Sequence, residues 1–183
     1  MEDDATRLLL KAIAFAAEKH RDQRRKDAEA SPYINHPIAL ANLLKQQDVG
    51  DVVVLCAALL HDTIEDTETT VAELRREFGD AITDVVLEVT DDATLEKTER
   101  KRLQIERAES LSKRAKLVKL ADKICNLRDM VESPPATWPL KRKLEYFEWA
   151  KHVVDGLRGT HRGLEELFDA VYENGLEALR RPE

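Results

Sequence analysis

The stretch VVVLCAALLHDTIEDTE, residues 52–68, joins nine apolar residues to one histidine and four acids. The apolar part is about half of the roughly 18 residues that a membrane span needs, so it predicts a buried helix in a soluble protein. At about 100° per residue, four polar side chains would share an arc of about 140° on this helix: His61, Asp62, Glu65 and Asp66. Acids at a helix end repel the helix dipole and one another, and a divalent cation would relieve both penalties. A solvated helix end is the alternative, and this stretch alone leaves both open.

The rest of the chain also has the apolar spacing of helices, interrupted by proline and glycine. We predict helices over residues 5–20, 37–47, 51–64, 70–79, 80–89, 97–109, 112–132, 139–157 and 160–180. No segment has the alternation of a strand, and no linker separates two domains. The prediction is therefore an all-α fold, a compact single-domain bundle of about eight to ten helices over residues 1–183. The pattern leaves open whether the last helix packs on this chain or on a partner.

Charge and cysteine content exclude several classes of protein. The net charge of −7 argues against broad binding to nucleic acid, and we expect no membrane partner. The first four residues, MEDD, are acidic, and no apolar segment typical of a secretory signal follows them. Cys56 and Cys125 are the only cysteines and lack metal-type spacing, so they are expected to be free thiols. A cytoplasmic location is the resulting prediction.

Two more stretches add candidate metal ligands. In YINHP, residues 33–37, His36 directly precedes a proline that suits the first turn of a helix and favours extended backbone before it. In KLVKLADKICNLRDM, residues 116–130, Asp122 and Asn126 are four apart and share a helix face. A lone histidine is more often structural. Together, however, two imidazoles and two carboxylates suit a borderline ion such as Mn²⁺, Fe²⁺ or Zn²⁺: His36, His61, Asp62 and Asp122.

A basic loop and two acids complete a candidate catalytic site. Glu65 and Asp66 lie about one turn beyond the HD pair, where they can orient or deprotonate a water molecule. The loop HRDQRRKD, residues 20–27, precedes His36 and carries guanidinium groups suited to phosphate oxygens. Further residues could extend this pocket: Lys97, Arg142 and Tyr146. Each one alone is more simply a solvated charge, but a metal facing a basic loop favours hydrolysis of a phosphate ester or anhydride.

These motifs resemble a known family. The matching stretches span about residues 6–160 and are HRDQRRKD, SPYINHPIALANLL, AALLHDTIEDT, LEVTDD, ERKRLQIERAESLSKRAKLVKLADKICNLRDM and LEYFEWAKHVVDGLRG. The chain resembles the HD-domain hydrolase of the RelA/SpoT alarmone enzymes, and most of all the stand-alone small hydrolases that include the animal SpoT-homologue type. The combination of RK, YINHP, HDTIEDT and KLADKICNL carries most of this resemblance.

The resemblance implies an all-α HD-type hydrolase that uses Mn²⁺. It implies that the 3′-pyrophosphate of the alarmone (p)ppGpp leaves as pyrophosphate, with GDP or GTP as the second product. The implied metal ligands are His36, His61, Asp62 and Asp122, and the acid pair is Glu65 and Asp66. The implied substrate contacts are Arg25, Lys26, Tyr33, Lys97, Asn126, Arg142 and Tyr146. Trp138 could also face the pocket, although packing in the core or against a helix is its simpler role. Residues 27–31 lack the glycine that many members carry in this loop.

Other functions stay open at this point. The same metal site could serve an NADPH 2′-phosphatase or another nucleotide phosphohydrolase, since related proteins share the pocket chemistry. A non-enzymatic nucleotide-binding module would be expected to lack a ligand or an acid, and none is missing here. The length leaves no room for the synthetase domain of the long members, so hydrolysis without synthesis is expected. The predicted partner is a small-molecule nucleotide, and a homo-oligomer is left open.

Overall fold

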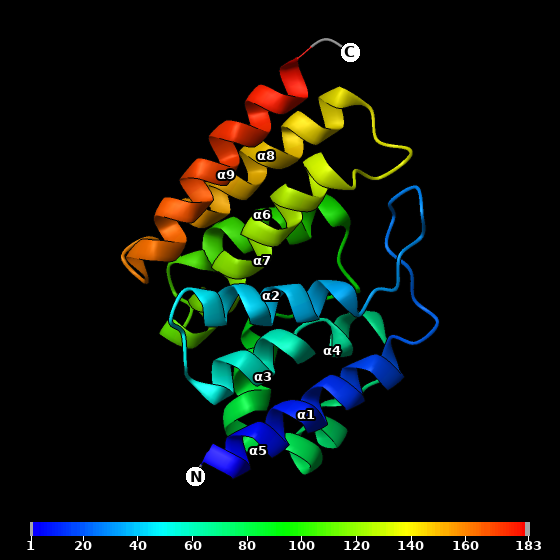
Figure 1. Ribbon diagram of the computed structural model, residues 1–183, viewed down its shortest axis with the longest axis vertical. Coiled ribbons are helices and arrows are strands. Elements are labelled where there is room, and N and C mark those ends of the chain that lie inside the picture. Colours follow the sequence, from blue (N-terminus) through cyan, green and yellow to red (C-terminus); the bar gives the residue numbers. More distant parts are fainter. Residues whose placement is uncertain (1, 182–183) are drawn as a thin grey trace.

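The computed structural model describes residues 2–181, and these form nine α-helices without a strand (Figure 1). The helices are α1 (Glu2–Lys19), α2 (Asn35–Gln46), α3 (Val52–Leu60), α4 (Thr63–Asp66), α5 (Val71–Val89), α6 (Lys97–Ala108), α7 (Lys113–Glu132), α8 (Leu140–Asp155) and α9 (Arg162–Arg180). One isolated bridge joins Arg24 to Pro32 in the loop before α2. The prediction of an all-α bundle of eight to ten helices is confirmed.

The apolar helix α3 and the amphipathic helix α7 form the centre of the bundle. Seven consecutive residues of α3, Val54–Leu60, are buried, because the helix contacts α1, α2, α5 and α7. α7 contacts α2, α3, α5, α8 and α9, and eleven of its residues are buried. Figure 1 shows α8 and α9 side by side at one end, with α1 and α5 at the other. A polar side chain on α3 or α7 is therefore held rigidly, on backbone that is packed on several sides.

The predicted continuous helix over residues 51–64 is wrong, because the chain turns at His61 and Asp62. α3 ends at Leu60, Asp62 has φ −100° and ψ 0°, and the four-residue α4 follows. Two side chains bond to backbone carbonyl oxygens near the break. Thr63 Oγ1 donates to Leu60 O at 2.7 Å, and His61 Nδ1 contacts Ala58 O at 2.8 Å. Such side-chain bonds compete with the helical ladder. The HD pair therefore lies on a turn rather than on one helix face.

The start of α2 also differs from the sequence prediction. α2 begins at Asn35, so His36 lies in its first turn rather than in extended backbone before Pro37. A proline is tolerated here because the first N–H groups of a helix have no intrahelical acceptor. The break predicted at Gly79 is confirmed: φ is +77° there, and the helical dihedrals of α5 are interrupted. Thr70 caps α5, accepting a hydrogen bond from the Glu73 amide at 3.1 Å.

α9 packs on this chain, against α7 and α8. Leu164 and Phe168 are fully buried, and Gly175 lies so close to Phe147 that an added Cβ would be 2.6 Å from the ring. We expect Gly175→Ala to lower the free energy of unfolding, because overpacking costs about 1–3 kcal/mol and exceeds the gain of about 1 kcal/mol from helix propensity. Urea unfolding followed by circular dichroism measures this change.

Gly163→Ala is the matched control in the same helix. Its added Cβ would lie 2.8 Å from the flexible end of Gln47, which can move away, and at ordinary contact distance, 3.4 Å, from the ring of His161. This variant is expected to unfold at the wild-type urea concentration or above it. If Gly175→Ala also unfolds like the wild type, the space beside Phe147 accommodates a methyl group and the expected overpacking is wrong.

Both cysteines are free, as predicted, and both are buried within the two central helices. Cys56 is 0% exposed in α3, and Cys125 is 6% exposed in α7. Burial raises the pKa of the Cys56 thiol to about 11 and that of Cys125 to about 12.

Among the described residues, no helix has the length and hydropathy needed to cross a membrane.

Candidate metal and nucleotide site

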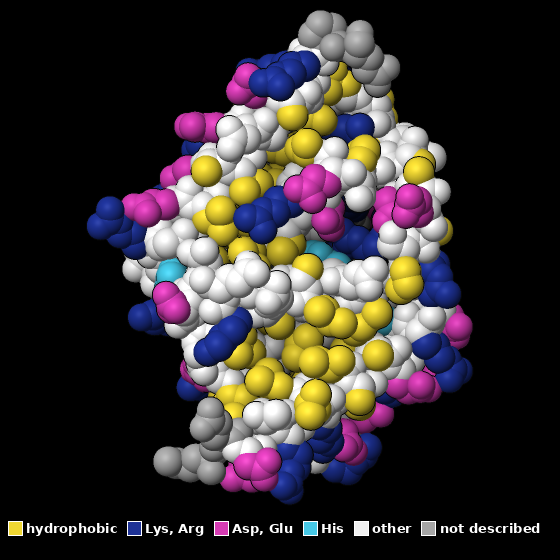
Figure 2. Space-filling model, in the orientation of Figure 1, with side chains coloured by type: hydrophobic (Ala, Val, Ile, Leu, Met, Phe, Trp, Pro, Cys, Tyr) yellow, Lys and Arg dark blue, Asp and Glu magenta, His cyan; other side chains and the backbone are white. Residues whose placement is uncertain are grey.

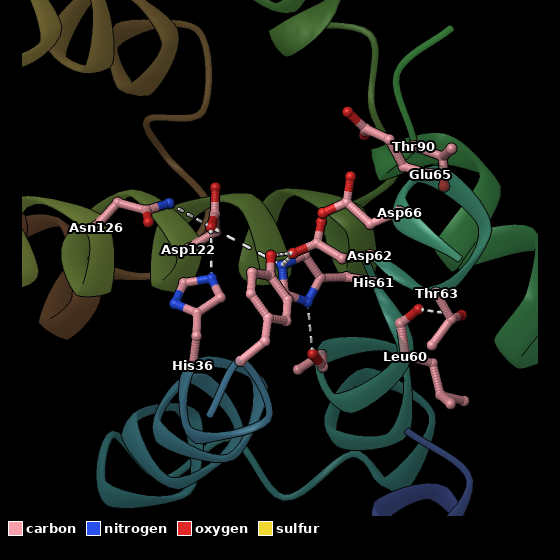
Figure 3. Close-up of polar contacts among 12 residues, drawn as sticks. His36, Leu60, His61, Asp62, Thr63, Glu65, Asp66, Thr90, Asp122 and Asn126 are labelled. Carbon is pink, nitrogen blue, oxygen red and sulfur yellow. Dashed lines mark hydrogen bonds and ion pairs between the residues drawn. The ribbon is translucent and has the colours of Figure 1, made fainter. Parts of the chain in front are cut away.

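Four side chains from three parts of the fold line one cavity of about 320 Å³: His36, His61, Asp62 and Asp122. His36 comes from the first turn of α2, Asp122 comes from the middle of α7, and the other two come from the turn between α3 and α4. In Figure 3 they face one another across the helices. The four predicted ligands are therefore brought together, although they are far apart in sequence.

The spacing of these four residues suits one ion. Ligand atoms of His36, His61 and Asp62 all lie within 4.8 Å of one another. Asp122 Oδ1 is 3.2 Å from His36 Nε2 and 3.9 Å from His61 Nε2, so it borders the same point from α7. Two ligands at about 2.1 Å from one ion are at most about 4.2 Å apart. The group of His36, His61 and Asp62 needs to close only slightly to hold a divalent cation, and Asp122 lies beside its two histidines.

His61 gives the clearest test of that fit. Its Nδ1 contacts the Ala58 carbonyl, which leaves Nε2 free to be a ligand. Nε2 is buried and lies 2.9 Å from Asp62 Oδ2 without forming a hydrogen bond, which is an arrangement expected of two ligands to one ion. Burial lowers the pKa of His61, but Asp62 and Asp122 outweigh it and raise the pKa to about 9. The cavity therefore favours a positive charge at this point, and the residues present fit a divalent metal ion.

Asp122 is fixed by its neighbours on α7. Lys123 donates to Oδ2 at 2.9 Å, and Asn126 donates to Oδ1 at 2.6 Å. Burial alone would raise the pKa of Asp122, but Lys123 and His36 hold it well below its usual value. This carboxylate is therefore ionised and oriented toward the histidines, as a metal ligand must be.

The two candidate catalytic acids have different surroundings. Asp66 is exposed and accepts one hydrogen bond, from Gln23 Nε2 at 3.1 Å. Glu65 is partly buried, and both of its oxygens have partners: Arg100 Nη1 at 3.0 Å and the Asp91 amide at 3.1 Å. Burial raises the pKa of Glu65. Both acids line the metal cavity, and Figure 3 shows Asp66 close to Asp62, with Glu65 beyond it.

A second cavity, of about 360 Å³, adjoins the metal cavity. Six residues line both: Arg25, Lys26, Tyr33, Asp66, Asn126 and Tyr146. Five of these are predicted substrate contacts. The two remaining predicted substrate contacts, Lys97 and Arg142, line a neighbouring hollow. Their charged groups lie 5.6 Å and 4.1 Å from the ring of Trp138, which borders the second cavity. The predicted substrate residues thus border a continuous region from the metal cavity outward.

On the face that Figure 2 displays, acidic and basic side chains gather beside a hollow in which histidine atoms are visible.

Comparison with known proteins agrees with this site. The pattern of the HD domain family matches residues 12–145. The chain is 54% identical to the Xenopus tropicalis protein named guanosine-3′,5′-bis(diphosphate) 3′-pyrophosphohydrolase MESH1, over 94% of this chain and 96% of that relative. The chain belongs to the MESH1 family of HD-domain proteins. The human protein of the same name is 56% identical, over 90% of this chain and 93% of its own length.

A solved structure supports the same assignment. It is described as a metazoan ortholog of SpoT that hydrolyzes ppGpp and plays a role in starvation responses. It matches this MESH1-family chain with a TM-score of 0.89 and 48% identity, over 91% of this chain and 94% of that one. The resemblance to the small stand-alone RelA/SpoT-type hydrolases, stated from the sequence motifs, is therefore confirmed.

Several residues of this MESH1-family site were not predicted. Asp129 pairs with Arg25, and its spacing of seven from Asp122 on α7 could have placed it on the same helix face. Tyr33 was predicted to contact substrate, but its hydroxyl donates to Asp62. Gln23 and Arg100 contact acids 43 and 35 residues away, so no local pattern marks them.

Proposed function

We propose that this protein is a metal-dependent hydrolase of the 3′-pyrophosphate of (p)ppGpp. The reaction consumes one water molecule and yields pyrophosphate together with GDP from ppGpp or GTP from pppGpp. The observation that carries this proposal is the convergence of two histidines and two carboxylates beside a cavity lined by Arg25 and Lys26. The names of the Xenopus and human relatives support the same reaction.

The four side chains His36, His61, Asp62 and Asp122 would hold the ion, for which we propose Mn²⁺. Such an ion supplies positive charge that polarises phosphate oxygens and activates water. The orientation of the ligands comes from the protein: Ala58 fixes His61, and Lys123 and Asn126 fix Asp122. Rigid packing of α3 and α7 keeps this geometry before substrate arrives.

The acids and cations of the chain have separate roles in this proposal. Asp66 lies at the junction of the two cavities, where its free oxygen accepts the proton of the attacking water. Glu65 orients that water from the metal cavity. The basic groups Arg25 and Lys26 bind phosphate oxygens. The guanine base of the substrate lies toward the second cavity, where the aromatic side chains of Tyr33, Tyr146 and Trp138 form the walls. Lys97 and Arg142 reach outer phosphate groups of the substrate.

Four further parts of the proposal concern the chain as a whole. We propose that residues 1–183 form one domain, that the protein is cytoplasmic, that it binds no nucleic acid, and that Mn²⁺ is the preferred ion. The net charge of −7 supports the exclusion of nucleic acid. A homo-oligomer stays an open prediction.

The deciding experiment is ion-exchange chromatography of ppGpp after incubation with the purified protein and Mn²⁺. GDP and pyrophosphate are expected with metal, and neither is expected after treatment with a chelator. NADPH is incubated in parallel. Turnover of NADPH without turnover of ppGpp would replace the proposed substrate while keeping the metal chemistry.

A further inference from the structure

We infer that Arg100, on α6, is a positioning residue that holds Glu65 for catalysis. Arg100 Nη1 donates to Glu65 Oε1 at 3.0 Å, and the two side chains are only 29% and 19% exposed. The Asp91 amide binds the other oxygen, Oε2, at 3.1 Å. Glu65 is therefore held at both oxygens, in a fixed orientation. This inference rests on the proposed hydrolysis.

Arg100 acts from behind the acid rather than from the reaction cavity. Glu65, Asp91 and Gln104 line the metal cavity, and Arg100 does not. Arg100 lines an adjoining cavity of about 30 Å³, which shares Asp91, Gln104 and Lys119 with the metal cavity. Its Nε is buried there without a protein partner, as is Gln104 Oε1. Its contact with the metal cavity is the hydrogen bond to Glu65, so Arg100 is placed to act on the reaction through that acid.

The local charge explains why this position needs an arginine. The metal cavity brings Glu65 close to three other carboxylates: Asp62, Asp66 and Asp91. Like charges in a partly buried site repel, and Glu65 would turn toward solvent or take up a proton without a cation. Gln104 holds Asp91 in place, donating to its Oδ2 at 2.5 Å. The Arg100 guanidinium, with the Asp91 amide, keeps the Glu65 carboxylate in the cavity.

Another explanation of the contact is that Glu65 is only a resting partner for Arg100, and that Arg100 binds a substrate phosphate during the reaction. The two explanations differ in the kinetic parameter that changes. Loss of a positioning residue lowers kcat and leaves KM nearly unchanged, because it removes an interaction that acts in the transition state. Loss of a phosphate-binding residue raises KM.

The test compares Arg100→Ala and Arg100→Lys with wild type in the ppGpp assay, with bound Mn²⁺ measured in each. Arg102→Ala is the matched control, since Arg102 lies on the same helix, is 54% exposed and pairs only with Glu99 and Glu106 among the described residues. We expect Arg100→Ala to lower kcat about 10–100-fold, with KM and metal content held within about twofold and Arg102→Ala like wild type. Arg100→Lys is expected to restore part of kcat, because it keeps the charge but not the planar fork.

Two additional measurements distinguish positioning from a purely structural effect. Millimolar guanidinium is expected to raise the kcat of Arg100→Ala several-fold, by entering the space of the removed side chain. In a Glu65→Gln background, Arg100→Ala is expected to cause little further loss, since both changes disable one unit. The inference would be overturned if Arg100→Ala had the kcat of the wild type, or if it raised KM and left kcat unchanged. It would also be overturned if the effects of Arg100→Ala and Glu65→Gln on kcat were fully additive. A wild-type protein without turnover would instead overturn the proposed function, and the inference with it.

Discussion

Asp62→Ala is expected to lose bound metal and hydrolase activity together. Asp62 Oδ2 lies 2.9 Å from His61 Nε2 in the proposed ligand group, so its removal would leave two imidazoles and one carboxylate to hold the proposed ion. A bound metal contributes several kcal/mol to the transition state, and about 1.4 kcal/mol is a factor of ten. The rate is therefore expected to fall at least about a thousandfold. Metal content after dialysis and the rate of GDP release measure the two effects.

Asp84→Ala is the control for this prediction. Asp84 is 58% exposed on α5 and pairs with Arg75, away from the ligand group. It should keep wild-type metal content and rate. Circular dichroism distinguishes loss of metal from loss of the fold, because Asp62 also accepts from the Tyr33 hydroxyl. A folded Asp62→Ala protein that still binds Mn²⁺ at wild-type affinity would contradict its assignment as a ligand.

Asp66→Asn is expected to separate metal binding from turnover. The amide side chain of this variant would keep an oxygen that can accept from Gln23, so local geometry should be preserved. It cannot accept a proton from water, and loss of general base catalysis lowers rates by about 10²–10⁴. We therefore expect normal Mn²⁺ content and ppGpp binding, with kcat reduced by that factor. Calorimetry and the chromatographic assay measure binding and turnover separately.

Glu68→Gln is the matched control for Asp66→Asn, since Glu68 is an exposed acid two residues away that does not line either cavity. It should leave kcat unchanged. A full rate in Asp66→Asn would show that another group accepts the proton, and Glu65 would then be the first candidate.

The sequence could predict most of the helices because apolar spacing and helix boundaries follow local rules. The apolar spacing on α7 placed Asp122 and Asn126 on one face, and the motifs of the family pointed to the other proposed ligands. The turn after Leu60 escaped prediction, because the bonds of Thr63 and His61 to carbonyls depend on rotamers that periodicity does not encode. The prediction of the metal site was unaffected, since the HD pair still reaches the cavity.

The contacts that hold the acids could not be predicted for a different reason. Gln23 and Arg100 approach Asp66 and Glu65 only because the loop before α2 and the start of α6 fold back over α4. Residues 21–26 and 97–107 each contain several arginines and lysines, and nothing in their spacing distinguishes a positioning group from a solvated one. Tertiary structure alone makes that distinction.

The two buried thiols give the protein a pair of internal reporters of opening. Cys56 and Cys125 lie in α3 and α7, the helices that lead to His61 and carry Asp122. A thiol reacts as the thiolate, and the reagent must reach it. While the helices stay packed, burial keeps both thiols protonated and out of reach of the reagent. Their labelling rates therefore follow the free energy of opening of each helix. Comparing those rates with and without Mn²⁺ would tell how far a bound ion ties the two central helices together.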